Sequence, residues 1–208
     1  MSRTLATSEV PETKRRLLDA ATGLMMQQGF TATTVDEICE EAKLTKGSFF
    51  HYFKSKEEIG EGALDHYFDR QKSMFGQADF NKLPDPLERL NGLLDFIAER
   101  VVGTDKVQGC LMGNLTQELA LTHPKIRASC NEKFTMLAGM IEGMLREAKT
   151  QHRAKTDFDP KSVATLFISL MQGSMLLAKV RQDRSVLKEN LGHFRSYVDA
   201  LFTDPKRR

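Results

Sequence analysis

The sequence predicts an all-α protein of about nine helices. Apolar residues recur at spacings of three and four through most of its 208 residues, and no segment shows the strict alternation of a β-strand. Threonine, serine or aspartate stands before most of the expected helices, and two of the aspartates are followed directly by proline. The hydrophobic share of 40% and the charged share of 28% are typical of a globular chain rather than a disordered one.

Three helices are expected to form an N-terminal domain over residues 12–55, after a flexible arm at residues 1–11. The first helix covers residues 12–28, and the glycine that follows it is placed to end it in a left-handed conformation. A capping box at residues 34–37 then opens a short second helix.

The stretch Lys43–Glu58 contains four lysines interleaved with aromatic rings, and it has no acid before Glu57. Thr45 is placed to cap a third helix of about two turns, and Ser55 is placed to cap the next one. Two short helices that follow a longer one across a tight turn are typical of a helix-turn-helix, whose second helix reads DNA. Considered alone, the stretch also fits a solvated basic loop beside a hydrophobic anchor.

The remaining helices are expected to form a second domain over residues 56–203, followed by a basic tail at residues 204–208. A long helix from residue 56 to about 76 starts this domain, and no flexible linker separates it from the N-terminal helices. The further helices are expected at residues 86–103, 109–121, 124 to about 149, 160–183 and 185–202.

The last two helices indicate self-association. Helix 160–183 is apolar on nearly every side, which in a soluble protein requires cover on both sides. Helix 185–202 repeats apolar residues at spacings of four and three, which suits a bundle seam. We expect a homodimer through the helices 160–183 and 185–202; the alternative is a monomer with an unusually central helix.

The composition indicates which cell compartment and which partners to expect. The formal net charge of only +2 argues against a diffuse nucleic-acid coat, so any contact with DNA depends on locally concentrated lysines. Three cysteines without metal-ligand spacing indicate reduced thiols rather than a disulfide scaffold. The start of the chain lacks the pattern of a signal peptide, and polar residues interrupt the longest apolar run. We therefore expect a cytoplasmic protein with no membrane segment, metal site or cofactor.

Two other classes of function fit the sequence less well. A helical thiol enzyme would use Cys110 and His123, but no triad signature, glycine-rich phosphate loop or metal set accompanies them. A module that dimerises without binding DNA is the other class. We expect a DNA-binding regulator and no enzyme.

Residues 12–60 resemble the N-terminal DNA-binding domain of the TetR family of bacterial transcriptional regulators. The similarity rests on the motif Thr-Val-Asp-Glu-Ile at residues 34–38 and on the run Leu44–Glu57. It implies a homodimer whose third helices enter successive major grooves of a palindromic operator. It also implies a repressor that leaves the operator when an effector binds the C-terminal domain.

The same resemblance assigns contacts with DNA. Thr34 corresponds to a phosphate contact and Lys56 to a phosphate clamp, which add affinity without much sequence preference. Lys46 suits a contact to guanine, typically worth about 1–3 kcal/mol of discrimination. Phe50 replaces the family's usual tyrosine, so we expect it to serve packing only. The expected DNA-binding residues are Thr34, Lys46, Gly47, Ser48, Phe49, His51, Tyr52 and Lys56.

A shorter similarity indicates a narrower branch of the family. Residues 109–111, with Asn114, Leu115 and Glu118 after them and the later stretch Leu176–Lys179, resemble regulators that sense electrophiles. The repressor of N-ethylmaleimide reductase is one of these regulators. The resemblance implies a reactive small molecule as the effector.

The sequence leaves two hypotheses for the trigger. In the first, Cys110 is oxidised or alkylated, because a helix start and a nearby Lys179 both favour the thiolate. In the second, Cys110 only lines the pocket or the core and the effector binds non-covalently. Methionine and phenylalanine side chains suit an adaptable apolar cavity, although ordinary core is their alternative. The expected effector or redox residues are Cys110, Asn114, Glu118, Phe134, Met140, Phe167, Met171 and Lys179.

Overall fold

The computed structural model describes residues 10–102 and 109–202. The arm predicted at residues 1–11 lies almost wholly outside these ranges, as do the helix end predicted at Gly103 and the tail at residues 204–208. Nine α-helices and a short 3-10 helix form over the described ranges, which confirms the predicted all-α fold. In chain order they are α1 (Glu12–Gln28), α2 (Val35–Glu41), α3 (Lys46–Tyr52), α4 (Lys56–Gly76), η1 (Asp79–Lys82), α5 (Pro86–Val102), α6 (Leu111–Leu119), α7 (Pro124–Gln151), α8 (Pro160–Arg181) and α9 (Ser185–Leu201).

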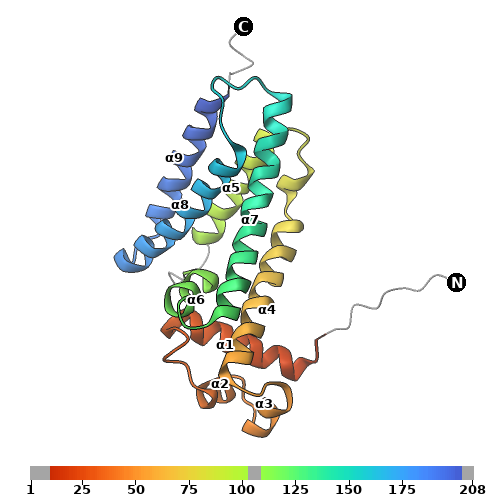
Figure 1. Ribbon diagram of the computed structural model, residues 1–208, viewed down its shortest axis with the longest axis vertical. Coiled ribbons are helices and arrows are strands. Elements are labelled where there is room, and N and C mark those ends of the chain that lie inside the picture. Colours follow the sequence, from red (N-terminus) through yellow and green to blue (C-terminus); the bar gives the residue numbers. More distant parts are fainter. Residues whose placement is uncertain (1–9, 103–108, 203–208) are drawn as a thin grey trace, which may run out of the picture.

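The helices divide the molecule into a small N-terminal end and a larger bundle (Figure 1). α1, α2 and α3 gather at one end, and we call these three helices the reading head. The long helices α4 and α7 run from the head along the bundle, while α8 and α9 lie together on its far side. The short helix α6 lies between the head and α8, so it contacts both parts of the molecule.

Local capping explains why most helices begin where the sequence predicts. The Oγ1 atom of Thr34 accepts a hydrogen bond from Glu37 N while the Glu37 side chain binds the Thr34 backbone, which completes the predicted capping box. Asp85 caps α5 by accepting from two backbone N–H groups, and Asp159 caps α8 ahead of its proline. Ser55 caps α4 as predicted.

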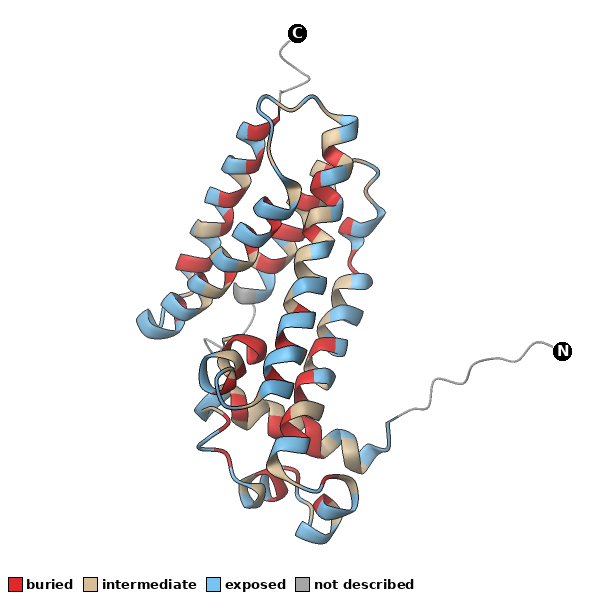
Figure 2. Cartoon of the chain, viewed as in Figure 1, coloured by how far each residue is buried: buried red, intermediate tan, exposed pale blue. Residues whose placement is uncertain are grey.

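Two hydrophobic clusters hold the fold together. The first joins the head to α4, α6 and the start of α7, and its fully buried members include Leu17, Ile38, Ile59 and Leu111. The second fills the space between α5, α7, α8 and α9. Figure 2 shows buried positions in the head, along the inner faces of the bundle and in α6. Because α4 and α6 belong to the head's cluster, packing ties the head rigidly to part of the C-terminal domain.

α8 departs from the expectation that no segment resembles a membrane span. By length and composition alone α8 is apolar enough to cross a membrane, and 33% of its most apolar part is buried in the fold. In the fold, one face of α8 packs against α7 and α9, and the hydroxyl of Ser174 accepts a hydrogen bond from Asn190 of α9. The apolar character of α8 therefore belongs partly to the bundle core and partly to an exposed face.

Candidate DNA interface and effector site

The third helix, α3, presents a largely polar face on the outside of the reading head. Thr45 caps α3 by accepting a hydrogen bond from Ser48 N at 3.1 Å. The side chains of Lys46 and His51 are exposed, and Gly47 leaves the backbone open to close approach. Ser48 is half-buried on the same short helix, as is Tyr52. The geometry suits a helix that lays its first residues against base edges in a major groove.

Phe49 corrects the sequence prediction. It was expected among the DNA-binding residues, but its side chain is 0% exposed and packs in the head's core. Its neighbour Phe50 was expected to serve packing only and is 57% exposed, with its ring edge-to-face on Phe49. Of the two rings, Phe50 is therefore the one available to a partner. Phe49 packs α3 against the other helices of the head.

An ion pair across the helix-turn-helix holds Lys46. Its Nζ atom lies 2.8 Å from Asp36 Oδ1 of α2, and both side chains are exposed. The hydrogen bond and the charge of Asp36 raise the pKa of Lys46 above its ordinary value. Exposed pairs of this kind contribute little to stability, so a phosphate or a base can replace Asp36 at small cost.

Lys56 has a contact that its predicted role as a phosphate clamp did not include. Its ammonium donates to the carbonyl oxygens of Phe30 at 3.1 Å and Thr31 at 3.2 Å, and it lies over the Phe30 ring. An ammonium has three N–H donors, so one remains for DNA. In this structure Lys56 fixes the loop between α1 and α2, next to the cap residue Thr34.

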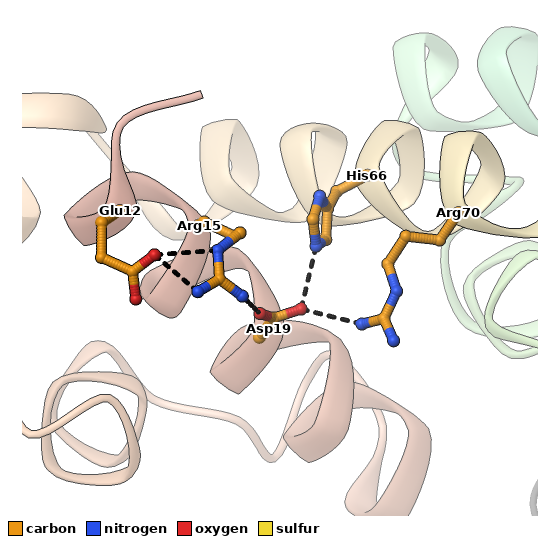
Figure 3. A network of polar contacts seen from close by, with 5 residues as sticks. All are labelled: Glu12, Arg15, Asp19, His66 and Arg70. Carbon is orange, nitrogen blue, oxygen red and sulfur yellow. Dashed lines mark hydrogen bonds and ion pairs between the residues drawn. The ribbon is translucent and has the colours of Figure 1, made fainter. Parts of the chain in front are cut away.

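Asp19 joins α1 to α4 at the base of the head (Figure 3). Its carboxylate lies between Arg15 of its own helix and His66 and Arg70 of α4. His66 Nε2 and Arg70 Nη1 each lie 2.9 Å from Asp19 Oδ1. Asp19 therefore joins α1 to α4 through polar contacts, in addition to the hydrophobic cluster that the two helices share.

A small cavity of about 70 Å³ lies between α6 and α8. The structure brings three of the predicted effector residues to it, namely Cys110, Asn114 and Lys179. The rest of its lining comes from Gly109, Gly113, Gln117, Gln172, Met175 and Leu176. A thiol, an ammonium and three amides therefore converge on one space beside two apolar side chains, as in a ligand site where a few polar groups set orientation.

Cys110 lies just before α6 rather than inside it. The predicted helix begins at residue 109, but Cys110 has an extended backbone and is the N-cap, so the first helical residue is Leu111. The side chain of Cys110 is 6% exposed. Tyr67 of α4 packs against the same hydrophobic cluster as Cys110, and burial, followed by the charge of the nearby Cys110, raises the pKa of the Tyr67 phenol.

Glu118 does not line the cavity, which corrects its prediction as an effector residue. It projects toward the head, where its carboxylate accepts hydrogen bonds from the backbone N–H groups of Phe30 at 3.3 Å and Thr31 at 3.0 Å. Four residues earlier on α6, the side-chain amide of Asn114 donates to Met26 O of α1 at 3.5 Å. One short helix thus borders the cavity and contacts the head.

The four predicted apolar effector residues also lie away from this cavity. Phe167 and Met171 are buried in the second cluster, where Phe167 packs against Phe194 with ring centroids 5.0 Å apart. Phe134 packs against the first cluster and Met140 against the second. Their helical spacing reflects the bundle core, which was the alternative reading of the methionines and phenylalanines.

The sequence also missed one glycine whose small size shapes the site. A Cβ atom built at Gly113 would lie 2.3 Å from the side-chain oxygen of Gln172, so an alanine there would displace the Gln172 side chain at the cavity. A glycine inside a predicted helix costs stability relative to alanine, and this cost was the available signal of a close approach. No group of three or more potential metal ligands forms within residues 10–102 and 109–202.

Comparison with known proteins decides the family. Residues 17–63 match bacterial regulatory proteins of the tetR family, and residues 86–194 match the tetracyclin repressor-like C-terminal domain. The second match alone spans more than half of the chain. The chain belongs to the TetR family. It is a DNA-binding transcriptional regulator that responds to a ligand, as the paired reading head and C-terminal domain of this family imply.

Individual TetR-family relatives match along most of their length. The chain is 27% identical to the transcriptional repressor DhaR of Mycobacterium sp. (strain GP1), over 86% of this chain and 88% of the relative. It is 25% identical to the repressor NemR of Escherichia coli (strain K12), over 90% of this chain and 94% of the relative.

Solved TetR-family structures share the arrangement of helices. The regulatory protein TetR from Rhodobacter sphaeroides superposes with a TM-score of 0.82 at 26% identity, covering 92% of this chain and 99% of that chain. The reduced form of E. coli NemR superposes with a TM-score of 0.77 at 22% identity, covering 93% and 99%. The second likeness, at this identity, shows the fold alone.

Proposed function

We propose that the protein is a cytoplasmic repressor that binds a palindromic operator as a homodimer and releases it when a small effector occupies the α6–α8 cavity. The observation that carries this proposal is the placement of α6. Its N-terminal end borders the cavity through the cap residue Cys110 and through Gly113 and Asn114, and its last turn holds the loop before α2 through Glu118. Occupancy of the cavity and the position of the reading head therefore depend on one rigid element. The relatives DhaR and NemR are transcriptional repressors, which supports this direction of control.

The homodimer is proposed to form through α8 and α9. α8 exposes four large apolar side chains beside its packed face: Leu166, Leu176, Leu177 and Val180, the last of them 75% exposed. At 100° per residue these four positions lie on one side of the helix. An exposed apolar face of this kind marks an interface, and a second copy of the chain is proposed to cover it symmetrically.

The effector is proposed to be small and polar, with a group that reacts with or bonds to the cavity side chains. A cavity of about 70 Å³ is far below the roughly 300–1,000 Å³ of sites for drug-sized ligands. The ammonium of Lys179 and the amides of Asn114, Gln117 and Gln172 suit a carbonyl or an anionic oxygen. The thiol of Cys110 suits an electrophile.

The covalent trigger is proposed on the position of Cys110 at the cavity. Burial raises the pKa of Cys39 and of Cys130, which keeps both thiols protonated and weakly nucleophilic. Of the three cysteines, Cys110 is the one that lines the α6–α8 cavity. With N-ethylmaleimide as the probe, its sulfur forms a bond to one alkene carbon, the carbon–carbon π bond breaks, and the thiol proton ends on the neighbouring carbon.

Binding to DNA from upstream of the protein's own gene tests the regulator. A gel shift across a range of salt concentrations is expected to show specific binding that weakens steeply with salt, since lysines replace counterions on the phosphates. A Val180→Glu variant places a charge in the proposed dimer face and is expected to weaken both dimerisation and binding. Binding that ignores DNA sequence and is unchanged in this variant contradicts the proposal.

Release by N-ethylmaleimide tests the trigger separately. Intact-mass spectrometry counts the adducts while operator binding is followed in the wild type and in Cys110→Ser. Release of the wild type with one adduct, and no release of the variant, supports the thiol trigger. Equal release of both proteins rejects it and favours non-covalent binding in the same cavity.

A further inference from the structure

An acidic side chain lies within the proposed DNA-binding surface. α2 and α3 form the outer end of the reading head, away from the bundle (Figure 1). Across the turn between them, Asp36 Oδ1 of α2 lies 2.8 Å from Lys46 Nζ of α3. The two side chains are 68% and 62% exposed, so both are open to a partner. Because DNA is a polyanion, a carboxylate at this surface opposes general affinity for it.

The two acids in the first turn of α2 have different partners. The Glu37 carboxylate turns back to the helix start, where it accepts a hydrogen bond from Thr34 N at 2.8 Å. The Asp36 carboxylate turns outward to the recognition helix instead. An exposed ion pair of this kind contributes little to stability. The capping box therefore forms without Asp36, and the contact of Asp36 with Lys46 is not required to hold the head together.

The charge of Asp36 distinguishes a phosphate from a base at Lys46. Breaking the exposed pair costs little for either partner. A phosphate drawn to Lys46 also approaches Asp36, because the two charged groups are in contact, and repulsion by the carboxylate offsets much of the attraction by the ammonium. The O6 and N7 atoms of guanine carry no net charge, so Lys46 meets no comparable repulsion when it binds them. The pair therefore favours base contacts over phosphate contacts.

We propose that Asp36 is a positioning residue for sequence specificity, which keeps Lys46 from the phosphates of unrelated DNA and leaves it available to a guanine in the operator. The inference rests on the proposed function, in which the reading head binds operator DNA. Specificity is a difference between two affinities, and repulsion of the wrong partner increases it as a contact with the right partner does. Asp36 acts through Lys46 and does not itself have to touch a base.

Binding to two duplexes across salt concentrations tests this role. Fluorescence anisotropy measures the affinities for labelled upstream DNA and for an unrelated duplex of the same length and base composition. Asp36→Asn removes the charge and keeps the shape of the side chain. It is expected to strengthen binding to the unrelated duplex at least about fivefold, and binding to the upstream DNA less than about twofold. Equal gains on the two duplexes, or no gain on either, overturn the proposal.

The salt slope on unrelated DNA shows whether Asp36 acts through the lysine. In Asp36→Asn the slope is expected to steepen by about one per reading head, because Lys46 then contacts a phosphate. The same substitution made in a Lys46→Ala background is expected to leave the slope unchanged. A steeper slope in that background as well would mean that Asp36 repels phosphates directly, and it would overturn the proposed role.

A matched acid on the same helix controls for net charge. Glu40 is exposed on α2, and Glu40→Gln is expected to change binding to both duplexes by the same factor. A loss of preference in Glu40→Gln as large as in Asp36→Asn would assign the effect to net charge and overturn the role of Asp36. A wild type without preference for the upstream DNA rejects the proposed function, whereas the salt slopes on unrelated DNA still decide whether Asp36 restrains Lys46.

Discussion

Glu118 holds Thr31 across the boundary between the C-terminal domain and the reading head. Its Oε2 atom accepts from Thr31 N at 3.0 Å and from the Thr31 hydroxyl at 3.3 Å. From the other side, Lys56 donates to the Thr31 carbonyl oxygen at 3.2 Å. Gly29 precedes this loop with a φ of +87°, and a Cβ there would collide with the Glu118 carboxylate. The loop that leads into α2 is therefore fixed by one acid from α6 and one base from α4.

Removing the Glu118 carboxylate is expected to uncouple the head from the cavity. Glu118→Ala deletes charge-assisted hydrogen bonds to Phe30 and Thr31, at a cost of about 1–2 kcal/mol of stability because the site is partly solvated. Operator release by a given effector concentration should fall several-fold. The comparison is with Glu132→Ala on the exposed side of α7. Unchanged release in Glu118→Ala would show that the signal takes another route.

Gly113 is expected to be essential for the cavity rather than for stability. In Gly113→Ala the new methyl group collides with Gln172, so the cavity narrows and the response to the effector weakens. In the matched control Gly143→Ala on α7, nothing lies within 4 Å of the new Cβ. This control should gain about 0.5–1 kcal/mol from helix propensity and respond normally. Effector titrations and urea unfolding of both variants measure the two effects.

Substitution of Phe49 and of its neighbour Phe50 in α3 should affect stability very differently. Phe49→Ala leaves a cavity in the head's core and should cost about 3–5 kcal/mol of stability. Phe50→Ala changes an exposed ring and should stay within about 0.5 kcal/mol of the wild type. Urea denaturation measures the free energy of unfolding of both variants. Similar decreases for the two would mean that α3 packs in a different orientation in solution.

Lys46 is expected to contribute sequence preference as well as charge. Lys46→Ala should weaken operator binding by about tenfold and bring it closer to the affinity for unrelated DNA. Lys72→Ala removes an exposed lysine of α4 and provides the comparison for net charge. Anisotropy with operator and scrambled duplexes measures both affinities. Equal loss on the two duplexes would reassign Lys46 to a phosphate contact.

The capping box of α2 should make part of the head's stability depend on pH. Hydrogen bonds from the Thr34 backbone and side chain hold the pKa of Glu37 below its ordinary value of 4.5. The folded state therefore favours the ionised carboxyl, so the contribution is complete above about pH 4.5 and is lost as the pH falls through the lowered pKa. Glu37→Ala should be less stable than the wild type at pH 7, and the difference should shrink at pH 3. Glu40→Ala, on the same helix and exposed, should show no such convergence.

The helix starts were predictable from the sequence because capping is local. Thr34, Thr45 and Asp85 lie within three residues of the N–H groups that they bind, so short motifs carry the information. Ser55 is a partial case. It caps α4, but the Glu58 carboxylate accepts from Lys54 N at 2.6 Å rather than from the cap residue. The spacing of Ser55 and Glu58 predicted a capping box, and only the half made by the Ser55 hydroxyl forms.

The surroundings of individual side chains were less predictable. Glu118 finds its partners 87 and 88 residues earlier in the chain, a separation that no periodic pattern reports. α3 is only seven residues long, too short for spacing to decide which of Phe49 and Phe50 faces inward. Phe134 and Met140 share the long helix α7, which passes from one hydrophobic cluster to the other. Tertiary packing, rather than local preference, sets each of these positions.

Footprinting of the DNA upstream of the protein's own gene tests the central claim most directly. A dimer with two reading heads is expected to protect two half-sites related by two-fold symmetry, with centres about one helical turn or a multiple of it apart. Both half-sites should lose protection together in Val180→Glu, because that variant disrupts the dimer. Protection of a single asymmetric site, or symmetric protection that persists in the monomeric variant, would contradict the account.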